Sequence, residues 1–139
     1  MDFRTEYFNP TTPVNIPVQG FSAGSRLRLV IVPNNDPGFH INLRTPDDIA
    51  LHFSPNFDDG SVKVNSTSGG EWQSEESRLR LPFEQNKMYT VEFVSNEGSI
   101  SVFVNGNHLA DFTERTPLEA VHLIEIDGGV QVNSVHISH

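Results

Sequence analysis

The stretch "IALHFSPNF", residues 49–57, decides how this chain is expected to fold. His52, Ser54 and Asn56 fall on one side of an extended backbone, and the phenylalanines between and after them fall on the other. An antiparallel strand that packs on a core and shows its other face to solvent has this alternation. The polar row is therefore a candidate binding surface on a sheet that aromatic residues hold from behind.

The same alternation recurs along the chain in runs that are rich in β-branched and aromatic residues. The runs cover residues 26–32, 39–43, 49–53, 61–65, 89–94, 99–104, 108–112, 120–126 and 130–138. Turn signals separate them, and the Asn-Gly at 105–106 is typical of a two-residue hairpin. About ten short strands without a helical period predict an all-β sandwich or barrel. Residues 118–121 have room for one helical turn at most, and the proline-rich start is expected to form an extended edge segment.

Composition limits the classes of function that remain. The 139 residues, of which 36% are hydrophobic, are expected to form one domain covering 1–139. A net charge of −9 without a Lys/Arg cluster argues against nucleic acid and against an anionic membrane surface. The absence of cysteine excludes disulfides, thiol catalysis and cysteine metal sites.

The first ten residues, "MDFRTEYFNP", have neither the apolar region of a secretory leader nor the character of a transit peptide. No run reaches the roughly 18 apolar residues that a membrane span needs. We therefore expect no membrane insertion and a location in the cytoplasm, outside the cell after non-classical export, or both.

Polar side chains gather on what alternation predicts is one face of four successive strands. Members of this set are His40, Asn42, His52, Ser54, Asn56, Ser61, Lys63, Asn65, Trp72, Glu75 and Ser77. A shallow polar patch with a single tryptophan at its edge suits a sugar. Hydroxyl groups are recognised by hydrogen-bonding side chains on rigid strands, and the apolar face of a pyranose packs on an aromatic plane.

The order "ALHFSPNF…VKVNSTSGGEWQSEE…LPFEQNKMYTVEF" resembles the carbohydrate-recognition domain of the galectins, the β-galactoside-binding lectins. The likeness extends to "FNPTTPVNIPVQGFSAGSRLRLV", to "VFVNGNHLADF" and to the terminal "VNSVHIS", so it covers nearly the whole chain. It implies a galectin-type jelly-roll β-sandwich of two antiparallel sheets, with a glycan on one of them. It also implies a lectin without cofactor or metal, and it permits a homodimer through the terminal strands.

The resemblance carries four functional residues over to this sequence. His52 matches the residue that bonds the axial 4-hydroxyl of galactose, and Asn65 the residue that contacts the 6-hydroxyl. Trp72 matches the stacking tryptophan, and Glu75 the acid that bonds sugar and orients arginines. This set implies that the patch is a β-galactoside site.

Three positions depart from the family pattern. Ser54 stands where the galectins have Asn, and Asn56 and Ser77 stand where they have Arg. Arg78 comes one residue late and, by alternation, is expected to face away from the groove unless a bulge re-aims it. A charge-assisted hydrogen bond contributes about 1.5–3 kcal/mol. Losing two of them is expected to weaken binding by about two to four decades.

Compensation is expected from the neighbouring strands. His40 and Asn42 are predicted to extend the groove beyond the galactose position, and Lys63 is predicted to project near it. These residues favour an extended or decorated oligosaccharide as the ligand. The alternative is a galectin fold that has lost lactose binding and serves as a protein-interaction or structural module.

An enzyme is the disfavoured reading. Glu75 and Glu76 are adjacent in an extended segment and point to opposite faces, so they cannot flank one glycosidic bond. The pairs of aspartates at 47–48 and 58–59 lie in turns, where they cap backbone amides. The remaining histidines lie on separate strands without ligand spacing, so no metal site is predicted.

Overall fold

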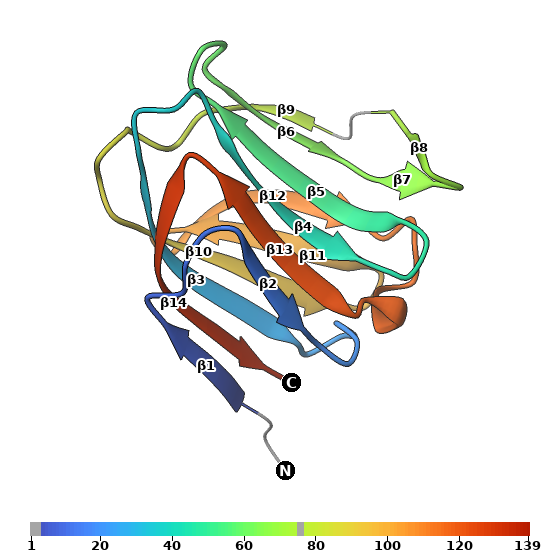
Figure 1. Cartoon of the computed structure of the whole chain (residues 1–139). Helices are drawn as coiled ribbons and strands as arrows, with labels where there is room; N and C mark the ends of the chain where they lie inside the picture. The colour runs from blue at the N-terminus through green and yellow to red at the C-terminus, as the bar shows by residue number, and fades with distance from the viewer. Residues whose placement is uncertain (1–3, 75–76) are drawn as a thin grey trace.

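The computed structural model describes residues 4–74 and 77–139, which form two antiparallel sheets packed face to face (Figure 1). The first sheet has the strand order β1-β14-β3-β10-β11-β12. Its strands are β1 (Arg4–Phe8), β3 (Arg26–Pro33), β10 (Tyr89–Asn96), β11 (Ser99–Val104), β12 (Asn107–Thr113) and β14 (Val130–Ser138). The predicted all-β sandwich of two antiparallel sheets is confirmed.

The second sheet carries the polar patch and has the order β2-β13-β4-β5-β6-β9. Its strands are β2 (Val14–Pro17), β4 (Phe39–Arg44), β5 (Ile49–Asn56), β6 (Ser61–Asn65), β9 (Ser77–Arg80) and β13 (Leu123–Gly128). A small hairpin of β7 (Thr67–Ser68) and β8 (Glu71–Trp72) follows β6 and projects from the end of this sheet (Figure 1). The patch therefore has a rigid floor of strands and a short hairpin at one end.

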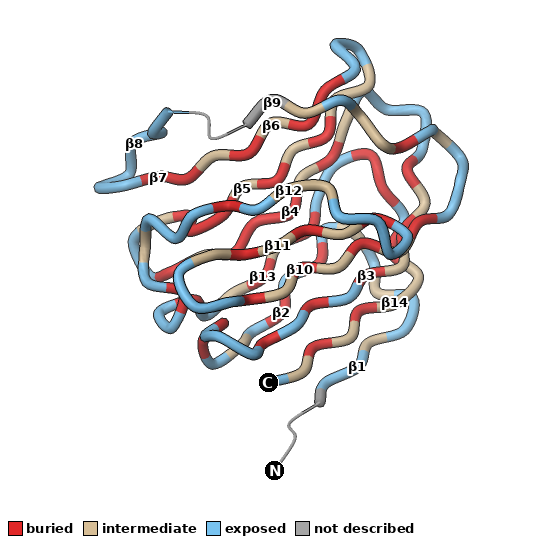
Figure 2. Tube along the Cα trace, turned by 180° about the vertical axis from the view of Figure 1, so that it is seen from behind, coloured by how far each residue is buried: buried red, intermediate tan, exposed pale blue. Residues whose placement is uncertain are grey.

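The core lies between the sheets, where the apolar side of each strand meets the other sheet. Phe53 of β5 is completely buried, with its ring 5.4 Å from Phe93 and 6.4 Å from Phe83, edge to face in both pairs. Figure 2 shows buried positions recurring along the strands of both sheets. Since side chains alternate across a strand, burying this row turns the polar row outward.

Most of the expected strands are observed with small changes at their ends. The runs at 61–65 and 130–138 coincide with β6 and β14. Asn105 and Gly106 have φ angles of 49° and 79°, so the predicted hairpin with two positive φ values is confirmed. The proline-rich start is extended and lies at an edge: β2 pairs only with β13 in the order of the second sheet.

The run at 120–126 differs from its prediction, because the strand begins at Leu123. The 3₁₀ turn η1 (Leu118–Ala120) precedes it, and the carbonyl of Leu118 accepts the amide of Phe21 at 2.8 Å. That contact ties the turn to the segment before β3 and delays the strand. Within the described residues, no helix has the length and apolar character needed to cross a membrane.

Replacing Phe53 by Ala should lower the free energy of unfolding by about 3–5 kcal/mol, because it empties a ring-sized site between the sheets. Guanidinium denaturation followed by circular dichroism measures this loss. Phe8→Ala is the matched control, because Phe8 is 72% exposed on the edge strand β1 and should change stability by less than about 0.5 kcal/mol. Equal losses in the two variants would contradict this assignment of the core.

Candidate functional site

Three strands of the second sheet place the central polar residues side by side. In the ladder, His52 of β5 pairs with Asn42 of β4 on one side and with Asn65 of β6 on the other. Ser54 pairs with Lys63 one step further along. A groove of about 320 Å³ opens over this face, and its lining residues are His52, Ser54, Lys63, Asn65 and Trp72.

His52 is held in a defined orientation by the buried residue beside it. Its Nδ1 lies 2.6 Å from Oδ1 of Asn42, which is only 4% exposed, and the Asn42 amide donates to Glu125 at 3.3 Å. Glu125 also forms an ion pair with Arg44. Asn42 was predicted to extend the groove; because it is buried, its direct contacts are with His52 and Glu125.

Burial is the largest cause that lowers the pKa of His52 to about 4, and electrostatic interactions with His40 and Arg44 also contribute to that shift. The ring is therefore neutral near pH 7. A neutral ring that donates from Nδ1 to Asn42 leaves Nε2 as an acceptor. Nε2 has no hydrogen-bond partner among the described residues, so His52 has an acceptor to offer a ligand hydroxyl.

Trp72 forms the end wall of the groove. It lies on β8, is 55% exposed, and its ring centroid is 4.8 Å from that of His52 at an interplanar angle of 60°. Such an exposed ring can take the apolar face of a sugar while the neighbouring imidazole meets a hydroxyl group.

The hairpin that carries Trp72 is fastened by Asp48, which lies in the turn between β4 and β5. Oδ1 of Asp48 accepts the Thr67 hydroxyl and the Gly70 amide, both at 2.9 Å, and Oδ2 accepts the Gly69 amide at 3.3 Å. The Gly70 amide and the Thr67 hydroxyl hold the pKa of the Asp48 carboxyl below its usual range. Sequence reasoning identified Asp48 as a turn cap but not as the anchor of a second turn about 20 residues away.

Asn65 is shared between the groove and the same hairpin. Its Nδ2 donates to the Gln73 carbonyl at 2.9 Å, and its Oδ1 accepts the Ser66 amide at 2.8 Å. Arg115, from the loop after β12, donates to the Ser74 carbonyl at 2.8 Å and reaches Oδ1 of Asn65 at 3.4 Å. Sequence reasoning missed Arg115, because a contact across 50 residues leaves no periodic signal.

Two of the positions that depart from the galectin pattern, Asn56 and Ser54, differ in their hydrogen bonds. Oδ1 of Asn56 accepts the amides of Asp58 and Asp59 at 2.9 and 3.1 Å, so this oxygen caps the turn after β5. Ser54 has no hydrogen-bond partner in the described part of the chain. Lys63, opposite Ser54, lies 3.6 Å from Asp59 and supplies the cation that lines the groove.

Strand β9 extends the ladder beyond β6. In its backbone register, Ser77 pairs with Val64 and Arg78 pairs with Lys63. The roles expected of Ser77 and Arg78 at the groove stay predictions, and Glu75 lies outside the described residues.

The His40 ring lies beside the His52 ring. It is half-buried on β4, and the centroids of the two imidazole rings are 5.8 Å apart. His40 is not among the residues that line the groove, so the extension of the groove along β4 stays a prediction.

Comparisons with known proteins agree with this geometry. A family model described as galactoside-binding lectin matches residues 12–137. Human galectin-7 is 34% identical over 124 residues, which are 86% of this chain and 91% of that protein. Rat galectin-4 is 30% identical over 93% of this chain, which spans only 42% of the length of that relative. The crystal structure of Caenorhabditis elegans galectin LEC-6 has a TM-score of 0.94 and 69% identity over 96% of both chains.

The fold and the family matches therefore define a lectin with a two-sheet β-sandwich fold. This chain belongs to the galectin family, and it is a galectin-type carbohydrate-binding lectin. Members of this family are lectins rather than enzymes, which at family level favours the predicted binding module over a glycosidase.

Replacing Asp48 by Asn should loosen the hairpin that carries Trp72, because a neutral amide cannot accept the three hydrogen bonds of the carboxylate. Trp72 is the single tryptophan, so its fluorescence anisotropy should fall and its quenching by acrylamide should rise. Asp47→Asn, at the exposed neighbouring position, is the control. An unchanged Trp72 signal in Asp48→Asn would show that the hairpin does not depend on this carboxylate.

His52 should make stability depend on pH in a known direction. Its pKa is about 4 in the folded chain and about 6.5 in the unfolded chain, so the unfolded state takes up the proton first. The stability conferred by neutral His52 is complete above about pH 6.5 and is lost as pH falls toward 4. The difference in Tm between the wild type and His52→Gln should therefore narrow over that range. His122→Gln, at an exposed position, is the control, and a constant difference for His52→Gln would contradict the lowered pKa.

Proposed function

We propose that this galectin binds β-galactoside-type glycans in the groove over β4, β5 and β6, with a weaker galactose anchor than the family pattern provides. The observation that carries the proposal is the pairing of a neutral, oriented His52 with the exposed ring of Trp72 at 4.8 Å. The name of the matching family model, galactoside-binding lectin, supports the same ligand class.

Each groove residue has a chemical role in this proposal. A sugar hydroxyl donates to Nε2 of His52, because Nδ1 is occupied by Asn42. The apolar face of the sugar ring packs on Trp72. Asn65 uses one amide hydrogen on the Gln73 carbonyl and keeps the second for a sugar oxygen.

The weaker anchor follows from the residues that replace the family pattern. The Asn56 oxygen is used by the turn, and the short Ser54 leaves space where a longer side chain would reach the sugar. Lys63 supplies a positive charge there, but an ammonium is a point charge and lacks the planar fork of an arginine. We expect monosaccharide binding to be weak and longer glycans to bind better through the surface beside His40.

A sequon in the groove supports the compartment that we propose. Asn65, Ser66 and Thr67 form an N-glycosylation sequon, and the Asn65 side chain is bonded to the Gln73 carbonyl inside the site. A glycan attached there would displace these contacts and fill the groove. We therefore place the active lectin in the cytoplasm, or outside the cell after non-classical export.

A second function has its own supporting observation. Because the groove has Ser54 in place of the family Asn and the Asn56 oxygen caps a turn, the chain is also suited to a role without sugar, as a protein-interaction module. The two functions differ in whether Trp72 is required for a glycan to be retained.

A broad glycan array with the wild type, Trp72→Ala and Phe8→Ala tests the proposal. Binding to a defined set of galactose-terminated glycans should fall at least about tenfold in Trp72→Ala, because the stacking surface is removed. It should be unchanged in Phe8→Ala, which deletes an exposed aromatic on the other sheet. Silence of a folded wild-type sample at high protein concentration would instead favour the interaction module.

A further inference from the structure

One row of polar side chains crosses three strands of the second sheet and ends at His52. In the ladder, Glu125 of β13 pairs with Asn42 of β4, and Asn42 pairs with His52 of β5. Hydrogen bonds follow the same row: the Asn42 amide donates to Oε1 of Glu125 at 3.3 Å, and Oδ1 of Asn42 lies 2.6 Å from Nδ1 of His52. Glu125 is not among the described residues that line the groove, so it can act on a ligand there only through Asn42.

Only one orientation of the Asn42 amide satisfies both of its neighbours. An ionised carboxylate only accepts, so Glu125 has to receive the NH₂ end of Asn42. The oxygen end then faces His52, and Nδ1 of that ring has to carry the hydrogen. Asn42 is only 4% exposed, so the reversed amide, with its oxygen against the carboxylate, would have little access to solvent. Glu125 therefore determines which nitrogen of His52 is protonated.

Arg44 fixes the oxygen that accepts from Asn42. Its Nε donates to Oε1 of Glu125, which is the same atom that accepts the Asn42 amide. Arg44 and Asn42 lie two positions apart on β4, so their side chains leave the strand on the same face. Because a guanidinium only donates, Arg44 keeps an acceptor, rather than a donor, opposite Asn42.

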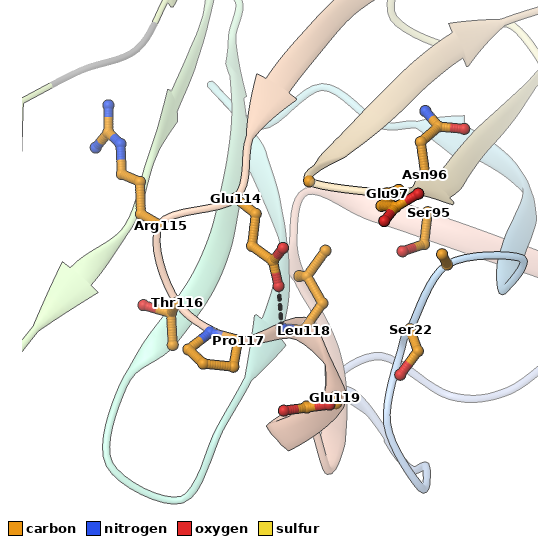
Figure 3. Close-up of a pocket in the computed structure, with 12 residues that line it drawn as sticks. Ser22, Ser95, Asn96, Glu97, Glu114, Arg115, Thr116, Pro117, Leu118 and Glu119 are labelled. Atoms are coloured by element: carbon orange, nitrogen blue, oxygen red, sulfur yellow. Dashed lines mark hydrogen bonds between the residues drawn. The ribbon is translucent and has the colours of Figure 1, made fainter.

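Asn65, which pairs with His52 on the other side, has only a donor left for a ligand. Its Oδ1 accepts the Ser66 amide at 2.8 Å and lies 3.4 Å from Nη1 of Arg115. Figure 3 shows the Arg115 side chain pointing away from the cavity between the loop after β12 and the β10–β11 turn, so this side chain supports the groove instead. One hydrogen of Nδ2 is used by the Gln73 carbonyl, which leaves the other for a ligand oxygen.

The other side chains of the groove are donors as well, with one exception. Lys63 has three donors and no acceptor, and the Trp72 indole has a single donor. The Ser54 hydroxyl can donate or accept. Among the described residues that line the groove, the His52 tautomer therefore decides whether a ligand hydroxyl finds an acceptor besides Ser54.

We propose that Glu125 is a positioning residue of the glycan site: it holds Asn42 in one orientation, sets the tautomer of His52 and leaves Nε2 as an acceptor in the groove. The part that concerns the ligand rests on the function proposed above, whereas the tautomer is a property of the free protein. Without Glu125, the reversed amide is no longer opposed. Nε2 would then carry the hydrogen, and a ligand hydroxyl would lose its acceptor at His52.

The test reads the tautomer from the ring ¹⁵N signals of His52, recorded near pH 8 without ligand. The wild type should carry the hydrogen on Nδ1. Glu125→Leu removes the acceptor at similar size, so the ratio of the Nδ1–H to the Nε2–H tautomer should fall at least about tenfold, because a charge-assisted hydrogen bond no longer holds the amide. Glu125→Gln should keep the wild-type tautomer, since its side-chain oxygen can still accept from Arg44 and Asn42.

A second variant shows whether Glu125 acts through Asn42. In the Glu125→Leu background, Asn42→Asp places a side chain without a donor beside His52, so the Nδ1–H tautomer should return. Glu92→Leu is the matched control and should leave the His52 signals unchanged. Glu92 also pairs with an arginine, Arg26 at 3.5 Å, but on the other sheet, and its side chain is 20% exposed against 25% for Glu125.

Titration with lactose in a calorimeter connects the tautomer with binding. The affinity should fall about tenfold in Glu125→Leu and stay near the wild-type value in Glu125→Gln and Glu92→Leu. If the folded wild type does not bind lactose, the proposed function fails for this ligand, and the ring signals still decide the role of Glu125.

Three results would overturn the inference, once circular dichroism shows that each variant is folded. One is a Glu125→Leu variant that keeps the hydrogen on Nδ1. Another is a failure of Asn42→Asp to restore the Nδ1–H tautomer in that background. The last is equal binding of lactose by the wild type and by Glu125→Leu.

Discussion

The register between β4, β5 and β6 is the constraint on which the rest of the structure depends. One row of this ladder, Ile41, Phe53 and Val64, is buried between the sheets. The adjacent row then has to emerge on the outer face, and it places Asn42, His52 and Asn65 next to one another. A slip of one residue would exchange the two rows. Core packing and groove geometry are consequences of the same pairing.

The groove has two parts that are stabilised in different ways. His52 stands on the sheet, where the core fixes the strand and the buried Asn42 fixes the ring. Trp72 stands on a two-residue strand outside the main sheets, and contacts from Asp48 and Arg115 hold its hairpin. These anchors come from the β4–β5 turn and from the loop after β12. The stacking proposed for Trp72 would therefore depend on polar contacts from residues far from it in the sequence.

The sequence was sufficient for features that repeat locally. Alternation predicted the strands and their faces, because a two-residue period is a direct consequence of strand geometry. Alternation did not predict features that depend on contacts between residues far apart in the sequence. The 3₁₀ turn before Leu123 depends on a hydrogen bond from the Phe21 amide to the Leu118 carbonyl.

The candidate site was predicted in outline but not in its supports. The role expected of Asn42 was changed by burial, which alternation alone does not report for an outward position. Arg115 was not predicted, because its contacts with the groove cross about 50 residues without a motif. The family resemblance supplied the residues that are proposed to face the ligand. The structure identified those that hold them in place.

The most direct test of the account is the ¹⁵N NMR signal of the His52 ring, recorded near pH 7 during a titration with a galactose-terminated glycan. The account predicts a neutral ring protonated at Nδ1, with a shift at Nε2 that saturates as the glycan binds. A ring protonated at Nε2, or a saturated glycan complex that leaves Nε2 unchanged, would contradict His52 as the hydroxyl acceptor of this site.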